Sequence, residues 1–325
     1  MRRRQFLGVM GGAAAAWPLA ARAQQAAMPV ISLFNSGNQA TNSKNLTTFR
    51  QGLKEAGFVE GQNVAIEFHW AENQFDRLAN LATEVIARRP AVIVANTLAA
   101  LRLKAATSTI PVVFTTGSDP IRDGLVTSMS RPGGNMTGVV FITGTLGAKR
   151  LELLRQFVPK ATKIAMLVNP GTPETDAERK DVQAAAQAIG REVDVLEVRS
   201  SSDVEKAFVA MVSRKADALL IGTGTFMGNN RGLLVALAAR HAIPTMYSNS
   251  ESVDIGGLMA YAASMPDAYH QAGLYTGRIL KGEKASDLPV MQSTKFRFAI
   301  NLNAAKALGL EFHPQLLATA DEVIE

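Results

Sequence analysis

Hydroxyl, amide and carboxylate side chains that directly follow apolar runs are the residues of this sequence with the clearest potential for chemistry. The stretch VVFTTGSDPI at 112–121 is typical, because apolar residues suited to a buried strand lead straight into the small polar run 115–119. Hydroxyls and backbone amides there could donate hydrogen bonds to a carboxylate, and Asp119 could receive an ammonium group. The stretch holds no cysteine, histidine or lysine, so its residue types favour binding over covalent catalysis.

Polar loops of the same kind follow the other apolar runs of the sequence. They offer amides, hydroxyls and a carboxylate at Glu251, while Phe226 and Tyr247 could wall an apolar part of a ligand. Taken singly, these residues have plainer explanations, because Ser and Thr often cap helices and aromatic residues often belong to the core. Their recurrence at corresponding positions in both halves of the chain favours a binding site. The candidate ligand-binding residues are Asn35, Ser36, Asn38, Asn96, Thr97, Thr116, Ser118, Asp119, Asn169, Thr225, Phe226, Tyr247 and Glu251.

The chain contains one series of motifs twice, with an offset of about 130 positions. An apolar run that ends in Asn and a turn occurs at 29–36 and again at 163–170, and an Ile-Pro pair opens both 110–115 and 243–248. Amphipathic helical patterns separate the apolar runs, and they cover 46–56, 77–87, 97–107, 178–189, 204–212 and 231–241. Strands that alternate with helices predict a parallel sheet covered on both faces. We therefore expect an α/β fold with two doubly wound parallel-sheet lobes.

Short strand-like runs at 138–142 and 257–262 close the two series, and each is followed by a new helical pattern, at 146–157 and 267–280. We interpret these places, with the extended segment 289–301, as crossings between the lobes that form a multi-strand hinge. The expected first lobe comprises 28–142 and 264–288, and the second comprises 143–263 and 289–325. Ligands of doubly wound sheets bind outside the carboxyl ends of the strands. The polar loops should therefore line a cleft between the lobes.

The first 23 residues have the features of an export signal of the twin-arginine type. Three arginines precede an Ala/Gly-rich apolar run, and Ala21-Arg22-Ala23 forms a cleavage site. An uncleaved anchor is disfavoured, because Trp17-Pro18 interrupts a run too short to span a bilayer. Cleavage after Ala23 would place the protein in the periplasm. It would also lower the net charge from +6 to +2, since the segment carries four arginines and no acid.

Composition narrows the function further. The chain has 325 residues, 47% hydrophobic and 19% charged, which suits a soluble two-domain protein. Its basic residues are scattered among acidic ones, so we expect no nucleic-acid partner. The absence of cysteine from the sequence excludes disulfides, thiolate metal sites and a cysteine nucleophile.

Enzymatic interpretations have little support in the residues. GTGTFMG at 222–228 follows an apolar run and loosely resembles a dinucleotide-binding loop, but it lacks the later acidic residue that would hold a ribose. The four histidines are far apart in the sequence and lack metal-ligand spacing. We therefore expect no cofactor, no metal and no catalytic activity, and a nucleotide-dependent enzyme remains the weakest alternative.

Several longer stretches carry a family resemblance, among them FRQGLKEAGFVEGQNVAIEFHWAENQFDRL, IPVVFTTGSDP, RPGGNMTGV, LGAKRLELLRQFVP and YTGRILKGEKASDLPVMQSTKF. The chain resembles the substrate-binding proteins of ABC transporters, in particular the tryptophan- and tyrosine-type members with the type I periplasmic-binding fold. The resemblance implies two lobes, three crossings at the hinge, a cleft site and delivery of the ligand to a membrane permease. It also implies a monomer that binds a small organic ligand, such as an amino acid or another small carboxylate.

By position, the resemblance places the ligand against 35–38, 96–97, 116–119, Asn169, 225–226 and Glu251. Two loops depart from the common pattern. The loop after the third strand reads Asn96-Thr-Leu-Ala where glycines are usual, and Ser248-Asn-Ser precedes Glu251 in place of a charged or aromatic run. These departures leave the identity of the ligand open. A sensor that presents its ligand to a membrane receptor would share the same fold and cleft, and is the alternative to an importer component.

Overall fold

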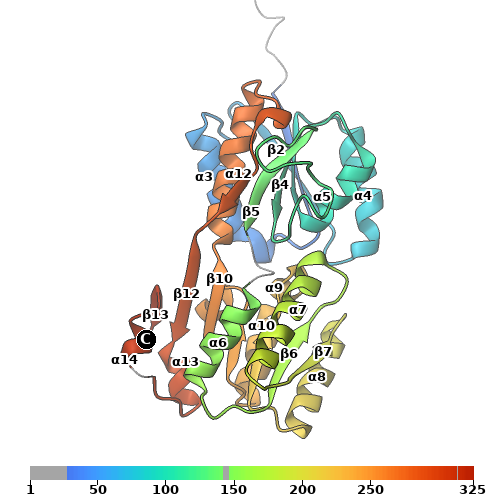
Figure 1. Ribbon diagram of the computed structural model, residues 1–325. Helices are drawn as coiled ribbons and strands as arrows, with labels where there is room; N and C mark the ends of the chain where they lie inside the picture. Colours follow the sequence, from blue (N-terminus) through green and yellow to red (C-terminus); the bar gives the residue numbers. More distant parts are fainter. Residues whose placement is uncertain (1–27, 142–145, 313) are drawn as a thin grey trace, which may run out of the picture.

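The computed structural model describes residues 28–141, 146–312 and 314–325. The expected export segment 1–23 lies outside the described residues. Two lobes stand one above the other, each built on its own twisted sheet with helices on both faces (Figure 1). The α/β architecture with two doubly wound lobes is therefore confirmed.

The first lobe is a parallel sheet in the order β11-β5-β4-β3-β1-β2. Its strands are β1 (Val30–Asn35), β2 (Ala65–Trp70), β3 (Val92–Asn96), β4 (Val112–Thr116), β5 (Met136–Phe141) and β11 (Met291–Ser293). Its helices are η1 (Ala40–Asn42), α3 (Ser43–Glu55), η2 (Phe75–Arg77), α4 (Leu78–Ala87), α5 (Thr97–Ala106), α12 (Met265–Leu280) and η3 (Ala285–Asp287). Every residue of β3 and β4 is buried. Strands covered on both faces need such continuous apolar runs, because neither side of the sheet meets water.

Helices α3 and α12 cover one face of this sheet and approach each other unusually closely. A Cβ placed on Gly52 would lie 2.0 Å from the backbone oxygen of His270, and one on Gly273 would lie 2.2 Å from that of Phe49. Only glycine fits at these two positions, because any larger residue would push the helices apart. The close contact fixes α12, whose first turn reaches the boundary between the lobes.

The second lobe is a sheet in the order β13-β12-β10-β9-β8-β6-β7. Its strands are β6 (Ile164–Val168), β7 (Val193–Glu197), β8 (Ala218–Ile221), β9 (Thr245–Tyr247), β10 (Met259–Ala263), β12 (Phe296–Asn301) and β13 (Glu322–Ile324). Its helices are α6 (Gly147–Phe157), α7 (Pro173–Ala188), α8 (Ser201–Ser213), α9 (Thr225–Asn229), α10 (Arg231–Arg240), α11 (Glu251–Asp254), α13 (Leu302–Ala307) and α14 (Pro314–Leu317). The core of this sheet repeats the order of the first lobe. The addition is an edge pair, in which β12 runs antiparallel to β10 and β13 runs parallel to β12.

The chain passes between the lobes after β5, between β10 and α12, and between β11 and β12. Strand β11 pairs with β5 at the edge of the first sheet. Residues 291–293 therefore belong to the first lobe, and the third passage lies between Ser293 and Phe296, a few residues later than the expected boundary at 289.

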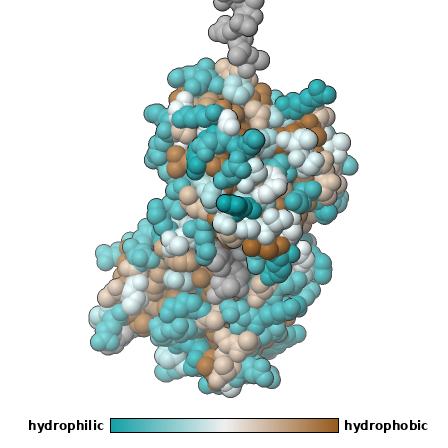
Figure 2. All heavy atoms as spheres, turned by 45° about the horizontal axis from the view of Figure 1, so that its top comes forward, coloured by the Kyte–Doolittle hydropathy of each residue, from teal (hydrophilic) through white to brown (hydrophobic). Residues whose placement is uncertain are grey.

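No helix within the described ranges is long and apolar enough to cross a membrane. On the face shown in Figure 2, hydrophobic residues lie in small groups among hydrophilic ones.

Candidate functional site

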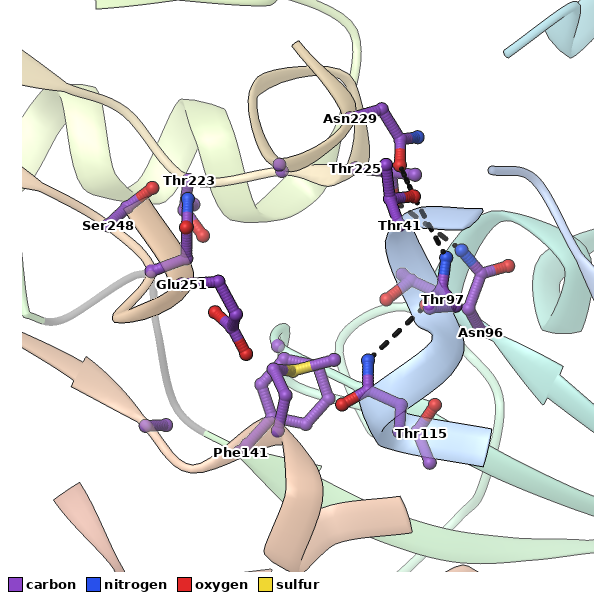
Figure 3. Close-up of a pocket in the computed structure, with 18 of the residues that line it drawn as sticks. Thr41, Asn96, Thr97, Thr115, Phe141, Thr223, Thr225, Asn229, Ser248 and Glu251 are labelled. Carbon is purple, nitrogen blue, oxygen red and sulfur yellow. Dashed lines mark hydrogen bonds between the residues drawn. The ribbon is translucent and has the colours of Figure 1, made fainter. Parts of the chain in front are cut away.

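A cavity of about 150 Å³ lies between the lobes, at the carboxyl ends of both sheets. Side chains from both lobes point into it (Figure 3). The first lobe contributes mainly hydroxyl and amide groups, and the second contributes hydroxyls, amides, the Arg231 guanidinium and the two carboxylates among the described lining residues. The lining residues used below are Asn35, Thr41, Asn96, Thr97, Thr115, Phe141, Glu174, Thr223, Thr225, Asn229, Arg231, Glu251, Met265 and Tyr269.

Five of the candidate residues line this cavity, namely Asn35, Asn96, Thr97, Thr225 and Glu251. The amide of Asn35 donates to the Tyr269 hydroxyl at 3.0 Å. The amide nitrogen of Asn96 donates to Ser36 Oγ at 2.7 Å, and to Thr225 Oγ1 of the opposite lobe at 3.4 Å. The Asn96 side chain makes no capping bond to α5, and Thr97, the first residue of that helix, lines the cavity.

Three other candidates lie just behind the first-lobe wall and do not line the cavity. Ser36 supports Asn96, because its backbone N–H donates to Asn96 Oδ1 at 3.1 Å. Asn38 caps the short helix η1, since its Oδ1 accepts from the Thr41 N–H at 3.0 Å. Thr116 is fully buried and accepts a hydrogen bond from the Thr97 hydroxyl at 3.1 Å. These residues position the lining residues.

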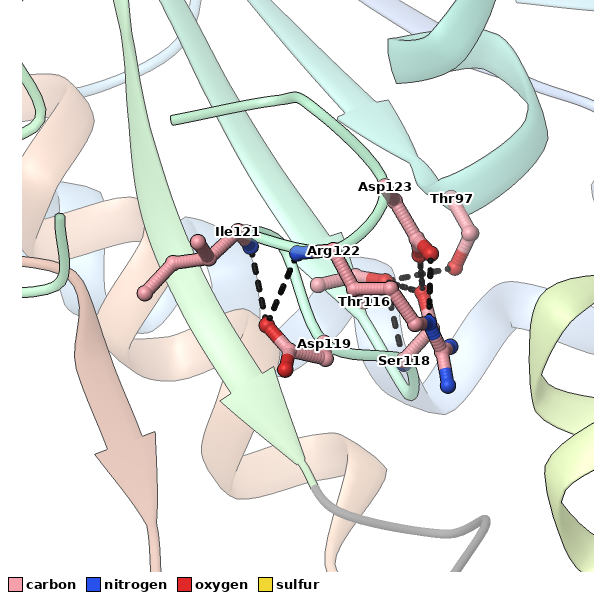
Figure 4. A network of polar contacts seen from close by, with 7 residues as sticks. All are labelled: Thr97, Thr116, Ser118, Asp119, Ile121, Arg122 and Asp123. Carbon is pink, nitrogen blue, oxygen red and sulfur yellow. Dashed lines mark hydrogen bonds and ion pairs between the residues drawn. The ribbon is translucent and has the colours of Figure 1, made fainter. Parts of the chain in front are cut away.

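Ser118 and Asp119 do not line this cavity, and their side chains are engaged in the polar network around their own turn (Figure 4). Asp119 Oδ1 accepts from the backbone N–H groups of Ile121 and Arg122, at 2.9 and 3.2 Å. Ser118 is hydrogen-bonded to Asp123 and Thr116. The carboxylate of Asp119 therefore stabilises its own turn before a proline, as aspartate commonly does in turns. Both residues border an adjoining space between the 117–122 loop and α7, which shares the lining residue Glu174 with the first cavity.

The remaining three candidates are also outside the cavity, in the interior of the second lobe. Asn169 is buried and donates to the backbone oxygen of Val198 at 2.8 Å. Phe226 and Tyr247 belong to the apolar core of this lobe, with exposures of 7% and 1%. Burial also raises the pKa of the Tyr247 hydroxyl. For Phe226 and Tyr247 the structure supports the plainer explanation, core packing.

Residues that the sequence pattern did not indicate complete the cavity wall. Met265 and Tyr269 come from the first turns of α12, Phe141 from the end of β5, and Glu174 from the first turn of α7. The sequence around Glu174 does carry a pattern, because an acidic residue after Thr172-Pro173 is typical of the first turn of a helix. That pattern predicts helix capping and gives no hint of a cavity.

The two lobes are in direct contact across the cavity. Asn229 of α9 accepts a hydrogen bond from the Thr41 hydroxyl, and its amide donates to the side chain of Asn73. Arg231 donates to the backbone oxygen of Gly228 at 2.9 Å, within its own lobe, and to that of Thr41 at 3.3 Å in the other. These bonds can form only when the lobes are close, so the structure represents a closed arrangement.

Glu174 has an unusual electrostatic environment for a cavity residue. It is 7% exposed, and its Oε2 atom has no hydrogen-bond partner among the described residues. Burial raises the pKa of this carboxyl above its usual value of 4.5, and the hydroxyls of Thr97 and Thr172 oppose that shift without cancelling it. Glu174 therefore has unused hydrogen-bonding capacity inside the closed cleft.

A buried ion pair supports the second-lobe wall. The guanidinium of Arg150 pairs with Glu178, and both side chains are 1% exposed. Arg150 also donates to the backbone oxygen of Tyr261 at 2.7 Å, and Glu178 accepts from the Thr223 N–H at 2.5 Å. The pair thus ties α6, α7 and β10 to the loop that presents Thr223 to the cavity.

Within the described part of the chain, no group of three or more His, Asp or Glu side chains is placed to hold a metal ion.

Comparisons with known proteins agree with this architecture. The order of both sheets and the cavity at their facing edges define a type I periplasmic binding protein. A family model described as "ABC transporter substrate binding protein" matches residues 38–324, so the chain belongs to the ABC transporter substrate-binding protein family. The chain is also 27% identical over 264 residues to the tyrosine-binding protein of Clostridioides difficile. The aligned region covers 81% of this chain and 76% of that protein.

Solved structures give the same fold. A Streptococcus pneumonia domain in complex with L-Trp matches with a TM-score of 0.83 at 24% identity, over 91% of this chain and 99% of the other. A ligand-free, open substrate-binding protein with adhesive properties from Clostridium difficile matches with a TM-score of 0.66 at 26% identity, over the same shares of the two chains. The lower score against the open structure agrees with the closed lobes seen here.

Proposed function

We propose that this protein is the periplasmic substrate-binding component of an ABC importer, with an amino acid as its ligand. In this proposal the chain is exported, cleaved after Ala23 and acts as a monomer that delivers the ligand to an inner-membrane permease. Support comes from the family, from relatives named for tyrosine or solved with L-Trp, and from the export pattern at 1–23. Those relatives differ from this chain at most positions, so their ligands do not fix the particular amino acid that this protein binds.

The observation that carries the proposal is the division of polar groups between the two walls. The first lobe offers the Thr115 hydroxyl and the uncapped start of α5 at Thr97, which together suit a carboxylate. The second lobe offers the carboxylates of Glu174 and Glu251, which suit an ammonium group. An α-amino acid carries both groups on adjacent atoms and would be bound by both walls at once.

Binding by both walls would also explain how the ligand favours closure. A ligand shifts the equilibrium between open and closed lobes only through its higher affinity for one of the two states. Contacts from the second lobe are gained on closure, so they supply this difference. The permease would then recognise the closed protein.

The proposal is tested by the melting temperature of the purified protein in the presence of the common amino acids. A ligand present at about 100 times its Kd stabilises the folded state by about 2.7 kcal/mol, which raises the melting temperature measurably. Thr97→Val should weaken the response, because the Thr97 hydroxyl bonds Thr116 and Glu174 and so orders the cavity wall at the start of α5, while valine keeps the side-chain shape. Thr83→Val, on the exposed side of α4, is the matched control.

If no amino acid raises the melting temperature, the proposal fails. Uptake of the bound amino acid by cells that lack this protein separates an importer component from a sensor. Loss of uptake supports the importer, and unchanged uptake supports the sensor.

A further inference from the structure

The interlobe cavity contains two carboxylates that have no basic partner among the described residues. Glu174 lies in the first turn of α7, and Glu251 is the first residue of α11. Arg231 is the only basic residue among the described lining residues, and its guanidinium donates to the backbone oxygens of Gly228 and Thr41. The charges of the cavity wall are therefore not balanced within the described residues.

Glu174 makes this imbalance significant, because it is too deeply buried to rely on water. A carboxylate that leaves water without a compensating partner loses much of its solvation energy. Its Oε2 atom has no partner in the described chain, and the side chain lines the cavity. A cationic group of a ligand would supply the missing partner.

Glu251 faces a different part of the same cavity. Figure 3 shows its carboxylate extending from the second lobe toward Phe141. Phe141, Met265 and Tyr269 form the neighbouring wall at the hinge side. An aromatic ring beside a carboxylate is a favourable environment for a cation, because the ring face and the carboxylate both attract positive charge. Glu174, by contrast, lies beside the Thr97 hydroxyl.

We propose that the ligand is an amino acid with a second, cationic group in its side chain, of the lysine, ornithine or arginine class. The α-carboxylate binds at Thr97 and the start of α5, and the α-ammonium binds the neighbouring Glu174. The side chain runs along Met265 and Tyr269, and its cation binds Glu251 beside Phe141. This inference rests on the proposed function, and it narrows the ligand to one class of amino acid.

Two matched pairs of ligands test the side-chain cation. L-Citrulline has the shape of L-arginine with a neutral ureido group, and L-norleucine lacks only the ε-amino group of L-lysine. Calorimetric titration of the purified protein should show at least one of the two cationic ligands bound about 100-fold more tightly than its neutral partner, because the neutral partner leaves Glu251 unpaired.

Two variants test which carboxylate binds the side-chain cation of the ligand and which binds its α-ammonium group. Glu251→Gln should bring the ratio of affinities within a matched pair close to one, while the neutral ligand keeps its affinity. Glu174→Gln should weaken cationic and neutral ligands alike, since both carry an α-ammonium. Glu205→Gln, an exposed residue of α8, is the control and should change neither value. Circular dichroism and the melting temperature without ligand verify that each variant is folded.

The outcomes separate this inference from the proposed function. If L-tyrosine, L-tryptophan or the neutral partners bind as tightly as L-arginine and L-lysine, the inference is overturned and an amino-acid receptor remains. An affinity ratio that survives in Glu251→Gln also overturns it. If no amino acid binds at all, the proposed function fails together with the inference.

Discussion

The hydrogen bonds of Asn229 allow a quantitative prediction about closure. This side chain bonds to Thr41 and to Asn73, both in the other lobe, so Asn229→Ala removes two bonds that exist only in the closed arrangement. Each bond contributes about 1 kcal/mol net, and their loss should destabilise the closed state by about 2 kcal/mol. Since 1.4 kcal/mol corresponds to a tenfold change in affinity, ligand binding should weaken about thirtyfold.

A second variant removes one of these bonds without changing the cavity wall. Asn73 is not a lining residue, and it has a positive φ of 64°. Glycine tolerates that conformation, so Asn73→Gly should delete the side chain with little strain. The loss of one bond predicts an affinity about fivefold weaker, from about 1 kcal/mol.

The assay is calorimetric titration with the amino acid that gives the largest thermal shift, combined with small-angle scattering to follow the lobes. Asn230→Ala is the control, because the neighbouring amide bonds only within the second lobe, to Phe226 and Ser201. It should lower the melting temperature without ligand and leave the affinity unchanged. If Asn229→Ala and Asn73→Gly both keep their affinity within about twofold, or if Asn230→Ala weakens binding equally, the reasoning is refuted.

Two predictions concern stability. Arg150→Met leaves Glu178 buried without its partner, so the free energy of unfolding measured in urea should fall by about 3–5 kcal/mol. The double variant Arg150→Met, Glu178→Leu should recover much of this loss, because it removes both buried charges. A double variant that is no more stable than Arg150→Met would contradict this prediction. Burial raises the pKa of Glu174 above 4.5, so the folded state holds this proton more tightly, and the stabilisation is lost as the pH rises from 4.5 through the folded-state pKa. The melting temperature of unliganded Glu174→Gln should therefore exceed that of the wild type by more at pH 7.5 than at about pH 4.5. An equal difference at both pH values would argue against an uncompensated carboxyl in the closed cleft.

Most of the architecture could be predicted from the sequence, because it follows from local pattern. The expected helix at 97–107 is α5 (Thr97–Ala106), and the apolar run before Thr115 is β4. The direction of β12 could not be predicted, since the apolar pattern of a strand is the same in either direction. Strand β2 begins only at Ala65, because Gly61 has a φ of +80° and lies in a turn.

The site could be predicted only where it depends on the end of a strand. Asn96 is the last residue of β3 and Thr97 follows it directly, and both line the cavity because the carboxyl ends of parallel strands meet at one edge. Tyr269 and Glu174 lie on helices, and what they face depends on how one lobe meets the other. Asp119 also follows a strand but does not line the cavity, because its carboxylate accepts a hydrogen bond within its own turn.

The placement of β1 and β13 in different lobes makes the protein suitable for optical distance measurements. Closure must change the separation between a label near Met28 and a label near Glu325, because the two positions move with different sheets. The sequence contains no cysteine, so two introduced thiols would be the only sites for a maleimide dye pair. Energy transfer between such dyes would report cleft opening in single molecules, and the native side chains of the cavity would stay unaltered.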